Sequence, residues 1–148
     1  MKKPTMVDIT EKDIVYREAE AYGRIRLRRE TINAIINKQI EKGDPTFVAA
    51  LAGIQAAKLT PQLLPLCHPI TLTKVDVECK IEDERHIGCK SIVKAAAKTG
   101  VEMEALAAVT VALVTIWDVV KRYEKDSNGQ YPETLIEEIR VVRKVKEE

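Results

Sequence analysis

The sequence predicts an α+β fold of the ferredoxin-like type, an antiparallel sheet with helices packed on one face. Three observations predict it. The expected elements follow the order strand, helices, hairpin, helix, strand. The strands alternate apolar and polar residues, and the helical segments carry apolar residues at helical spacing. The 148 residues fit a single domain, 1–148, with a full hydrophobic core.

The first part of the chain is expected to hold an arm, a strand and a helix. Residues 1–12 show no pattern and are expected to form a loosely held arm. A half-buried strand is predicted over 14–27, because every second residue there is small or apolar. A helix is predicted over 28–40, with Thr31 as its cap and four isoleucines on one side, namely Ile32, Ile35, Ile36 and Ile40.

A second helix has signals at both ends. Asp44 is well placed as its N-cap and Pro45 as its first helical residue, after the break at Lys42 and Gly43. We expect this helix to stop before Pro61, because a proline lacks the N–H that continues the ladder.

A β-hairpin is predicted over 75–81 and 87–95, with its turn at 82–85. Cys79 and Cys89 are symmetric about that turn, so their thiols are expected on the same apolar side. Two reduced core cysteines are the usual state in a mesophile's cytosol. The many Glu and Lys with few aromatics weakly favour a thermophile, where an internal disulfide is less improbable.

The rest of the chain is predicted to form a long helix over 101–123, a surface loop over 126–132 and a closing strand over 136–145. The helical segment is rich in Ala, Leu, Val and Glu and contains no Gly or Pro. At its start, Thr99 and Glu102 have the spacing of a capping box.

Composition narrows the class of protein. The 24 basic and 23 acidic residues leave a net charge of +1, which argues against a nucleic-acid binder. No apolar run follows the basic start, so no signal peptide is expected. The longest apolar stretch, Ala105 to Trp117, is too short to span a membrane. The three cysteines lack CxxC spacing, which argues against a zinc site. A cytoplasmic protein is expected.

The loop from Leu63 to Pro69 places a thiol, Cys67, beside an imidazole, His68. Pro65 and Pro69 stiffen it and hold the residues before them extended. An imidazole presented from such a loop can bind an anion or move a proton near neutral pH. Taken alone, the segment favours a tight turn into a strand with His68 merely exposed.

Both ends of the long helix carry candidate functional groups. At its start, Lys98 and the free backbone N–H groups are suited to an anion, and Glu102 and Glu104 add carboxylates. At its other end, Asp118 and Lys121 lie on one face, where an ordinary surface ion pair is the plainer reading.

The neighbouring Trp117 is also able to shelter the Asp118 carboxylate and raise its pKa. Glu104 and Asp118 are 14 residues apart, about 21 Å along an unbroken helix. One small substrate cannot easily touch both. If both ends are functional, the simplest arrangement is a site between two chains of a twofold dimer.

Several long motifs occur in a characteristic order along the chain. The motifs are Met6-Val7-Asp8-Ile9, Lys42-Gly43-Asp44, Ala52-Gly53-Ile54-Gln55-Ala56-Ala57-Lys58, Leu64-Pro65-Leu66-Cys67-His68-Pro69, Lys98-Thr99-Gly100-Val101-Glu102-Met103-Glu104-Ala105-Leu106 and Thr115-Ile116-Trp117-Asp118-Val119-Val120-Lys121. Together they resemble the molybdenum-cofactor biosynthesis protein C family, the cyclic pyranopterin monophosphate synthases. The resemblance covers Met6 to about Lys125.

The resemblance implies a lyase that converts a 3′,8-cyclised dihydro-GTP into cyclic pyranopterin monophosphate and releases pyrophosphate, with no metal or organic cofactor. It implies a homo-hexamer, a trimer of dimers with sites at the dimer interfaces, and a small-molecule substrate rather than a nucleic acid or a membrane. Asp118 matches the catalytic carboxylate and Lys121 its partner; Lys42 and His68 match the other polar active-site positions. The segments implied to contact substrate contain Leu66, Cys67, His68, Glu102, Met103 and Glu104, and Arg17 matches a basic residue nearby.

The chemistry needs these residue types. Rearranging a purine-derived ring demands several proton transfers, which a carboxylate, a lysine and an imidazole can supply. Expelling pyrophosphate demands cations around the phosphates. The hypothesis is that Lys42, His68 and Arg17 hold the phosphates, while Asp118 and Lys121 form the acid/base pair.

The chain departs from the family's pattern at its end. Many bacterial members carry a Gly/Lys/Ser-rich tail, whereas this chain ends Val141-Val142-Arg143-Lys144-Val145-Lys146-Glu147-Glu148. Two other functions compete. A non-catalytic nucleotide-binding or regulatory module would use Lys98, Thr99 and Gly100 and would not need Asp118. An RNA-binding domain of this fold would stack bases on sheet aromatics, and the predicted hairpin carries none.

Overall fold

The structure is a computed structural model that describes residues 1–147. Its helices and strands follow the predicted order. In chain order they are β1 (Val15–Arg26), α1 (Arg29–Ile36), α2 (Pro45–Leu63), β2 (Lys74–Ile81), β3 (His86–Ala97), α3 (Glu102–Glu124) and β4 (Leu135–Glu147).

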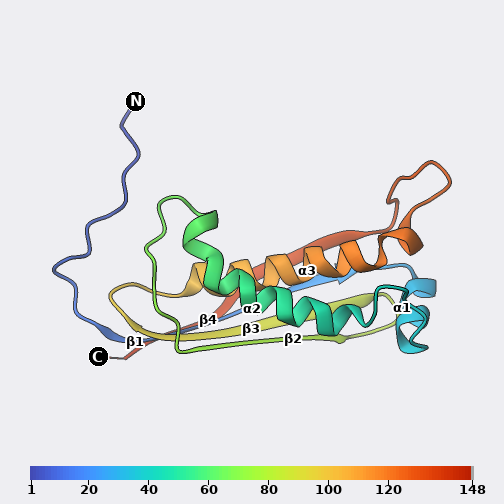
Figure 1. The fold of residues 1–148 in the computed structure, drawn as a ribbon, viewed down its shortest axis with the longest axis horizontal. Coiled ribbons are helices and arrows are strands. Elements are labelled where there is room, and N and C mark those ends of the chain that lie inside the picture. The colour runs from blue at the N-terminus through green and yellow to red at the C-terminus, as the bar shows by residue number, and fades with distance from the viewer. Residues whose placement is uncertain (148) are drawn as a thin grey trace.

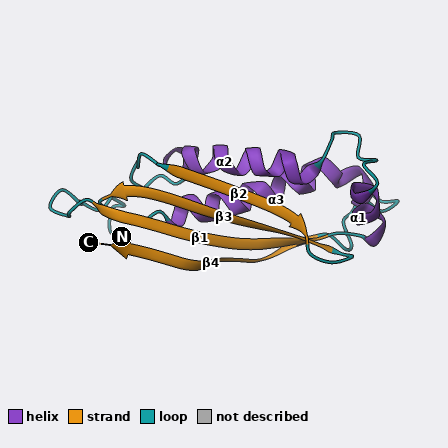
Figure 2. Ribbon diagram, turned by 90° about the horizontal axis from the view of Figure 1, so that it is seen from below, coloured by secondary structure: helices purple, strands orange, loops and turns teal. Residues whose placement is uncertain are grey.

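The strands form one antiparallel sheet in the order β2-β3-β1-β4. β3 lies between β1 and β2, and β1 lies between β3 and β4, so each helical connection passes over a neighbouring strand. Figure 2 shows α2 and α3 together on one face of the sheet. The predicted ferredoxin-like α+β fold is confirmed, because this order and this one-sided helix layer define it.

The core lies between the sheet and the two long helices. Small residues let these helices approach closely: a Cβ atom at Gly53 of α2 would lie 2.8 Å from the Ala108 carbonyl oxygen of α3. The buried face of β1 alternates as predicted, with Ala19, Ala21 and Ile25 at 1% exposure or less. Small side chains at these positions bring α3 down onto the middle of the sheet.

The first helix is shorter than predicted. It ends at Ile36, because Lys38 adopts a left-handed conformation (φ 57°) that stops it. Thr31 is not its cap: Arg28 is the N-cap, and Thr31 is buried inside the first turn, where its hydroxyl donates to Glu124. Ile40 is buried, but from the following loop rather than from the helix.

The second helix begins as predicted and ends later. The Asp44 carboxylate accepts a hydrogen bond from the Thr46 N–H, and Pro45 is the first helical residue. The helix does not stop before Pro61 but continues to Leu63. Pro61 has no backbone N–H to donate, but it lies close to the helix end. The Leu64 N–H still donates to the Thr60 carbonyl oxygen at 2.9 Å, so the last turn remains helical.

The predicted capping box at the start of α3 is wrong. Val101 is the N-cap, and no side chain caps the helix. The Glu102 carboxylate instead lies 3.6 Å from the Lys144 ammonium on β4. Glu102 therefore ties the helix start to the sheet.

The 23-residue helix α3 is long and apolar enough to pass for a membrane span, contrary to the expectation from the shorter apolar stretch. Half of its apolar window is buried inside this fold, as in the core helix of a globular protein. Figure 1 shows α3 lying along the sheet beside α2.

The predicted hairpin is confirmed, and it settles the cysteine question. Cys79 on β2 pairs directly with Cys89 on β3, and the two form a disulfide with a Cα–Cα distance of 4.1 Å. Cys67 is the one free cysteine among the described residues 1–147. The bridge joins the edge strand β2 to the interior of the sheet.

The disulfide makes a prediction for thiol counting. The unfolded protein should show one reactive thiol without reductant and three with it. Replacing both Cys79 and Cys89 by alanine should lower the free energy of unfolding by about 2 kcal/mol, because the bridge restricts the unfolded chain. A thiol reagent added to the denatured protein counts the reactive thiols, and a denaturant unfolding curve gives the free energy of unfolding. Three thiols without reductant would contradict the bridge.

Candidate active site

The predicted site residues form two groups at opposite ends of α3. One group lies where the loop from α1 to α2 meets the end of α3, and the other lies where the loop after α2 meets its start. Figure 1 shows these loops at the two ends of the molecule, with α3 unbroken between them. Within one chain the two groups are not brought together, which agrees with the distance inferred from the sequence.

The group at the end of α3 contains Asp118, Lys121 and Lys42. The Lys121 ammonium donates to Asp118 Oδ1 at 2.9 Å, one helical turn away. Lys42 arrives from the other loop, 3.4 Å from Asp118 Oδ2 and 3.2 Å from the Asp118 carbonyl oxygen. All three side chains are about half exposed, so the pair of cations and the carboxylate face solvent.

The two lysines determine the charge of this group. The hydrogen bond from Lys121, with that from Lys42, holds the pKa of Asp118 below its ordinary value. The same contact raises the pKa of Lys121. Trp117 does not raise the pKa of Asp118; its ring packs edge-on against Tyr131 at 5.1 Å. At neutral pH the site therefore holds a carboxylate beside an ammonium.

The group at the start of α3 surrounds a cavity of about 640 Å³. The segment Leu64–His68 forms one wall, and Thr99, Gly100, Glu102 and Met103 form another. The N-terminal arm closes a third side, because the Val7 carbonyl oxygen lies 2.6 Å from His68 Nε2. The arm has no helix or strand, but from Val7 onward it is held against this cavity.

The surroundings of Glu104, a predicted substrate contact, were not expected from the sequence. Its side chain is 1% exposed, and Oε1 is the one buried side-chain oxygen or nitrogen among residues 1–147 without a hydrogen-bond partner. Oε2 lies 3.9 Å from the Cys67 thiol. Burial raises the pKa of Glu104, and burial followed by the nearby Glu104 charge raises that of Cys67. The surroundings therefore disfavour the charged form of both groups.

The remaining candidates lie around the same end. Arg17 is buried on β1, and its guanidinium donates to the Ala97 and Lys98 carbonyl oxygens at 3.4 and 3.3 Å. The Lys98 ammonium donates to the Thr10 carbonyl oxygen at 3.0 Å, in the N-terminal arm. Met103 is 43% exposed at the cavity.

The sequence reasoning assigned no role to Asp8, Ile9 and Lys12, which also line the cavity. The only available signal was that Asp8 and Ile9 belong to the first recognised motif.

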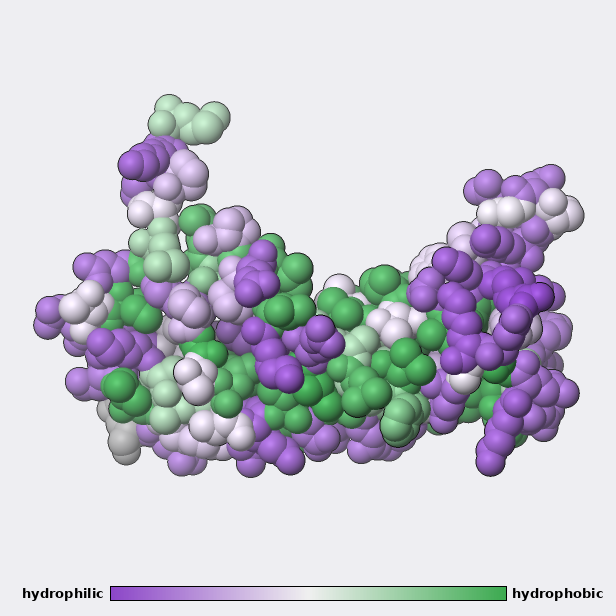
Figure 3. All heavy atoms as spheres, in the orientation of Figure 1, coloured by the Kyte–Doolittle hydropathy of each residue, from purple (hydrophilic) through white to green (hydrophobic). Residues whose placement is uncertain are grey.

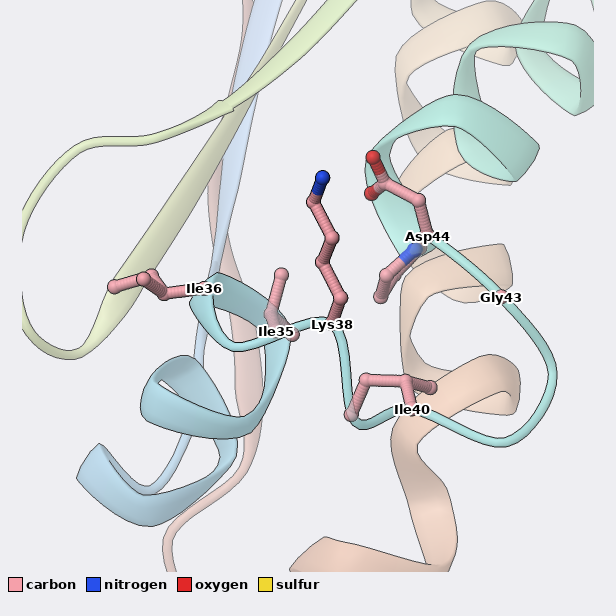
Figure 4. Close-up of a pocket in the computed structure, with 7 residues that line it drawn as sticks. Ile35, Ile36, Lys38, Ile40, Gly43 and Asp44 are labelled. Carbon is pink, nitrogen blue, oxygen red and sulfur yellow. The ribbon is translucent and has the colours of Figure 1, made fainter.

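A separate cavity of about 280 Å³ lies between α1 and α2 (Figure 4). It is lined mainly by Ile35, Ile36, Ile40 and Pro45 and contains none of the predicted site residues. Within residues 1–147, no group of three or more His, Cys, Asp or Glu side chains is placed to hold a metal ion.

The burial of Glu104 makes a prediction for Glu104→Gln. The folded-state pKa is raised, so the parent is fully stable while the carboxyl is protonated and loses stability as pH rises through that pKa. The unfolding free energy of the variant minus that of the parent should therefore increase as the pH rises from the ordinary glutamate pKa, about 4.3, toward the raised folded-state pKa. Denaturant unfolding at several pH values measures it. Glu102→Gln, at a neighbouring partly exposed glutamate, is the control, and a flat difference for Glu104→Gln would contradict the assignment.

Comparison with known proteins places this sequence in a family. The sequence matches the MoaC family over residues 6–147. It is 61% identical to a probable cyclic pyranopterin monophosphate synthase of Sulfurisphaera tokodaii, covering 99% of this chain and 96% of the relative. It is 57% identical to a protein of the same name from Saccharolobus solfataricus, covering 96% and 95%. A relative from Methanothermobacter thermautotrophicus, 53% identical over 95% of this chain and 88% of its own length, is named a probable cyclic pyranopterin monophosphate synthase accessory protein. With matches across nearly the whole length, the chain belongs to the MoaC family.

Proposed function

We propose that this protein is a cyclic pyranopterin monophosphate synthase of molybdenum cofactor biosynthesis. It converts (8S)-3′,8-cyclo-7,8-dihydroguanosine 5′-triphosphate into cyclic pyranopterin monophosphate and releases pyrophosphate, a lyase reaction on a small pterin precursor. The observation that carries the proposal is the near-full-length identity of 61% and 57% to proteins of that name. The two polar groups on α3 supply the acid, base and cationic residues that such a reaction needs.

The proton-transfer roles follow from the charges at the end of α3. Asp118 is ionised and is the proton acceptor, and Lys121 is charged and is the proton donor. Their hydrogen bond at 2.9 Å keeps donor and acceptor on one side of the substrate. Both groups are exposed before substrate binds, so a bound purine-derived ring can reach them.

The remaining side chains suit a triphosphate and a ring. Lys42, His68 and Arg17 are the candidates for holding the phosphates and the departing pyrophosphate. At the other end, Leu66, Cys67 and Met103 offer apolar and polarisable surface, and the Glu104 carboxyl offers an unpaired oxygen. Glu102 is the weakest candidate, because it already pairs with Lys144.

The site is proposed to form between two copies of the chain. α3 separates Glu104 from Asp118 by about 21 Å, so a substrate that uses both needs one end from each protomer. Large apolar side chains are exposed on the two long helices between these ends: Phe47, Leu51 and Leu59 on α2 and Val114 on α3. Figure 3 shows hydrophobic surface over the middle of this face, hollowed between two hydrophilic ends. Such a patch is typical of a surface covered by a partner.

We place this dimer in a homo-hexamer, a trimer of dimers, in the cytoplasm, with the whole chain acting as one synthase domain. No nucleic acid or membrane partner and no bound cofactor is part of the proposal. The competing function is a non-catalytic nucleotide-binding or regulatory module. The word "accessory" in the name of the Methanothermobacter thermautotrophicus relative is the observation that keeps it under test.

Asp118→Asn should abolish pyrophosphate release while leaving substrate binding largely intact, because the amide keeps the shape of the carboxylate but cannot accept a proton. Single-turnover pyrophosphate release and equilibrium binding of the cyclised GTP intermediate measure the two effects. If the folded parent binds the intermediate without consuming it, the protein is a binding module. If the variant loses binding instead, Asp118 is not the proton acceptor.

The shared site predicts that two inactive variants restore one another. His68→Ala changes the polar group near the start of α3, and Asp118→Asn changes the group near its end. If each site takes one group from each protomer, a mixed dimer contains one intact site and one doubly damaged site. Dissociating and reassembling an equal mixture should recover about a quarter of the parent's activity.

Mixing Asp118→Asn with Lys121→Ala is the matched control. Both changes damage the same end, so every mixed site keeps one fault and no activity should return. No recovery in the first mixture would place the whole site within one chain.

A further inference from the structure

The loop that carries Lys42 is held by contacts outside the recognised motifs. Residues 37–44 join α1 to α2 and belong to neither helix (Figure 4). The contact of Lys42 with Asp118 is between half-exposed groups at 3.4 Å. A pair of this kind is too weak to fix a loop by itself, because solvent screens it and the lysine side chain loses freedom. Something else must place Lys42 beside Asp118.

The hydroxyl of Tyr123, in the last turn of α3, contacts this loop on both sides of Ile40. It accepts a hydrogen bond from the Glu41 N–H at 3.2 Å and makes a long contact of 3.5 Å to the Gln39 carbonyl oxygen. Ile40 between them is 7% exposed and belongs to the core. The loop is thus attached to α3 immediately before Lys42.

The other side of Lys42 is fixed by the backbone. Gly43 has a φ of 108°, a conformation that favours glycine, and Asp44 caps α2 through the Thr46 N–H. Lys42 therefore lies between two constrained segments. Within residues 1–147, the other polar side-chain contacts between this loop and α3 are the exposed ion pairs of Arg122 with Glu41 and of Lys42 with Asp118.

Tyr123 is itself held in place. The adjacent Glu124 is 1% exposed and accepts hydrogen bonds from Thr31, Thr134 and the Arg28 N–H. The guanidinium of Arg28 donates to the Tyr123 carbonyl at 3.1 Å. These bonds tie the last turn of α3 to the start of α1 and to the loop before β4. The tyrosine ring thus projects from a rigid support.

We propose that Tyr123 is a positioning residue for the reaction: its hydroxyl holds the 37–44 loop so that the Lys42 ammonium reaches Asp118. The importance of the Lys42–Asp118 contact for catalysis rests on the proposed function. The placement of Lys42 is independent of it. Asp118, Lys121 and Tyr123 then lie within two turns of one helix, the first two as the proposed acid/base pair and the third as the positioning residue.

The test is Tyr123→Phe, which keeps the ring and removes the hydroxyl. We expect kcat for pyrophosphate release to fall about tenfold, because a small misplacement of a catalytic group is costly. The thermal midpoint should stay close to that of the parent. Tyr22→Phe is the matched control: it also loses a tyrosine hydroxyl bond, at 2.7 Å to Glu82. Tyr22 lies on the face of the sheet away from α3, because its neighbour Gly23 faces Val109 and Leu113 of that helix. Its kcat should not change.

Competitive labelling of lysine amines, without substrate, separates positioning from general loosening. In Tyr123→Phe the labelling rate of Lys42 should rise, while that of Lys121, which is held by its own helix, should not. Equal rates at Lys42 in variant and parent would overturn the proposal, as would an equal rise at both lysines.

The labelling result also separates the two proposals. A parent that releases no pyrophosphate would contradict the synthase assignment, yet the rates would still show whether Tyr123 places Lys42. In a Lys42→Ala background that retains measurable turnover, adding Tyr123→Phe should have no further effect. An undiminished loss there would mean that Tyr123 acts through another group.

Discussion

The continuity of α3 is the constraint on which the rest of the structure depends. Its 23 residues run without a break across the sheet, packed on β1 below and α2 beside it. A rigid rod of that length sets two groups of polar side chains apart and prevents the chain from folding them together. The fold therefore separates its candidate chemistry into two halves, which a second copy would join in the proposed dimer.

Two buried glutamates, one near each end of α3, differ in their hydrogen bonding. Glu124 accepts hydrogen bonds from two threonine hydroxyls and a backbone N–H, so its charge is satisfied and it serves the architecture. Glu104 is equally buried, but one of its oxygens has no partner. A buried polar atom left unpaired is costly, and such a cost is usually retained where a ligand supplies the missing bond. The contrast supports the proposed role of Glu104 in substrate binding, whereas Glu124 ties the end of α3 to α1 and to the loop before β4.

The sequence predicted the element order, the strand alternation of β1 and the hairpin well, because period-2 patterns and turn residues are local signals. It misjudged the ends of helices, where long-range contacts decide. Thr31 looked like a cap but donates to Glu124 far along the chain, and Glu102 turned to Lys144 rather than back to Thr99.

Within the site, helical spacing predicted the Asp118 and Lys121 pair, whereas Lys42 required the resemblance. Tyr123 belongs to no recognised motif, and its contact with the loop is seen only in the structure. Glu104 was a predicted substrate contact, but its burial and its unpaired oxygen are likewise seen only in the structure.

The bridge between Cys79 and Cys89 bears on the resistance of the protein to aggregation. β2 is an edge strand, with unpaired backbone groups along one side that could recruit a strand from another molecule. Its outward residues, Lys74, Asp76, Glu78 and Lys80, are charged and oppose such pairing. The covalent bond adds a second barrier, because it keeps β2 from peeling off and exposing the apolar interior of β3 to other chains. The edge of the sheet at β2 is thus protected against aggregation, and the helical face is the one that would meet a second copy in the proposed dimer.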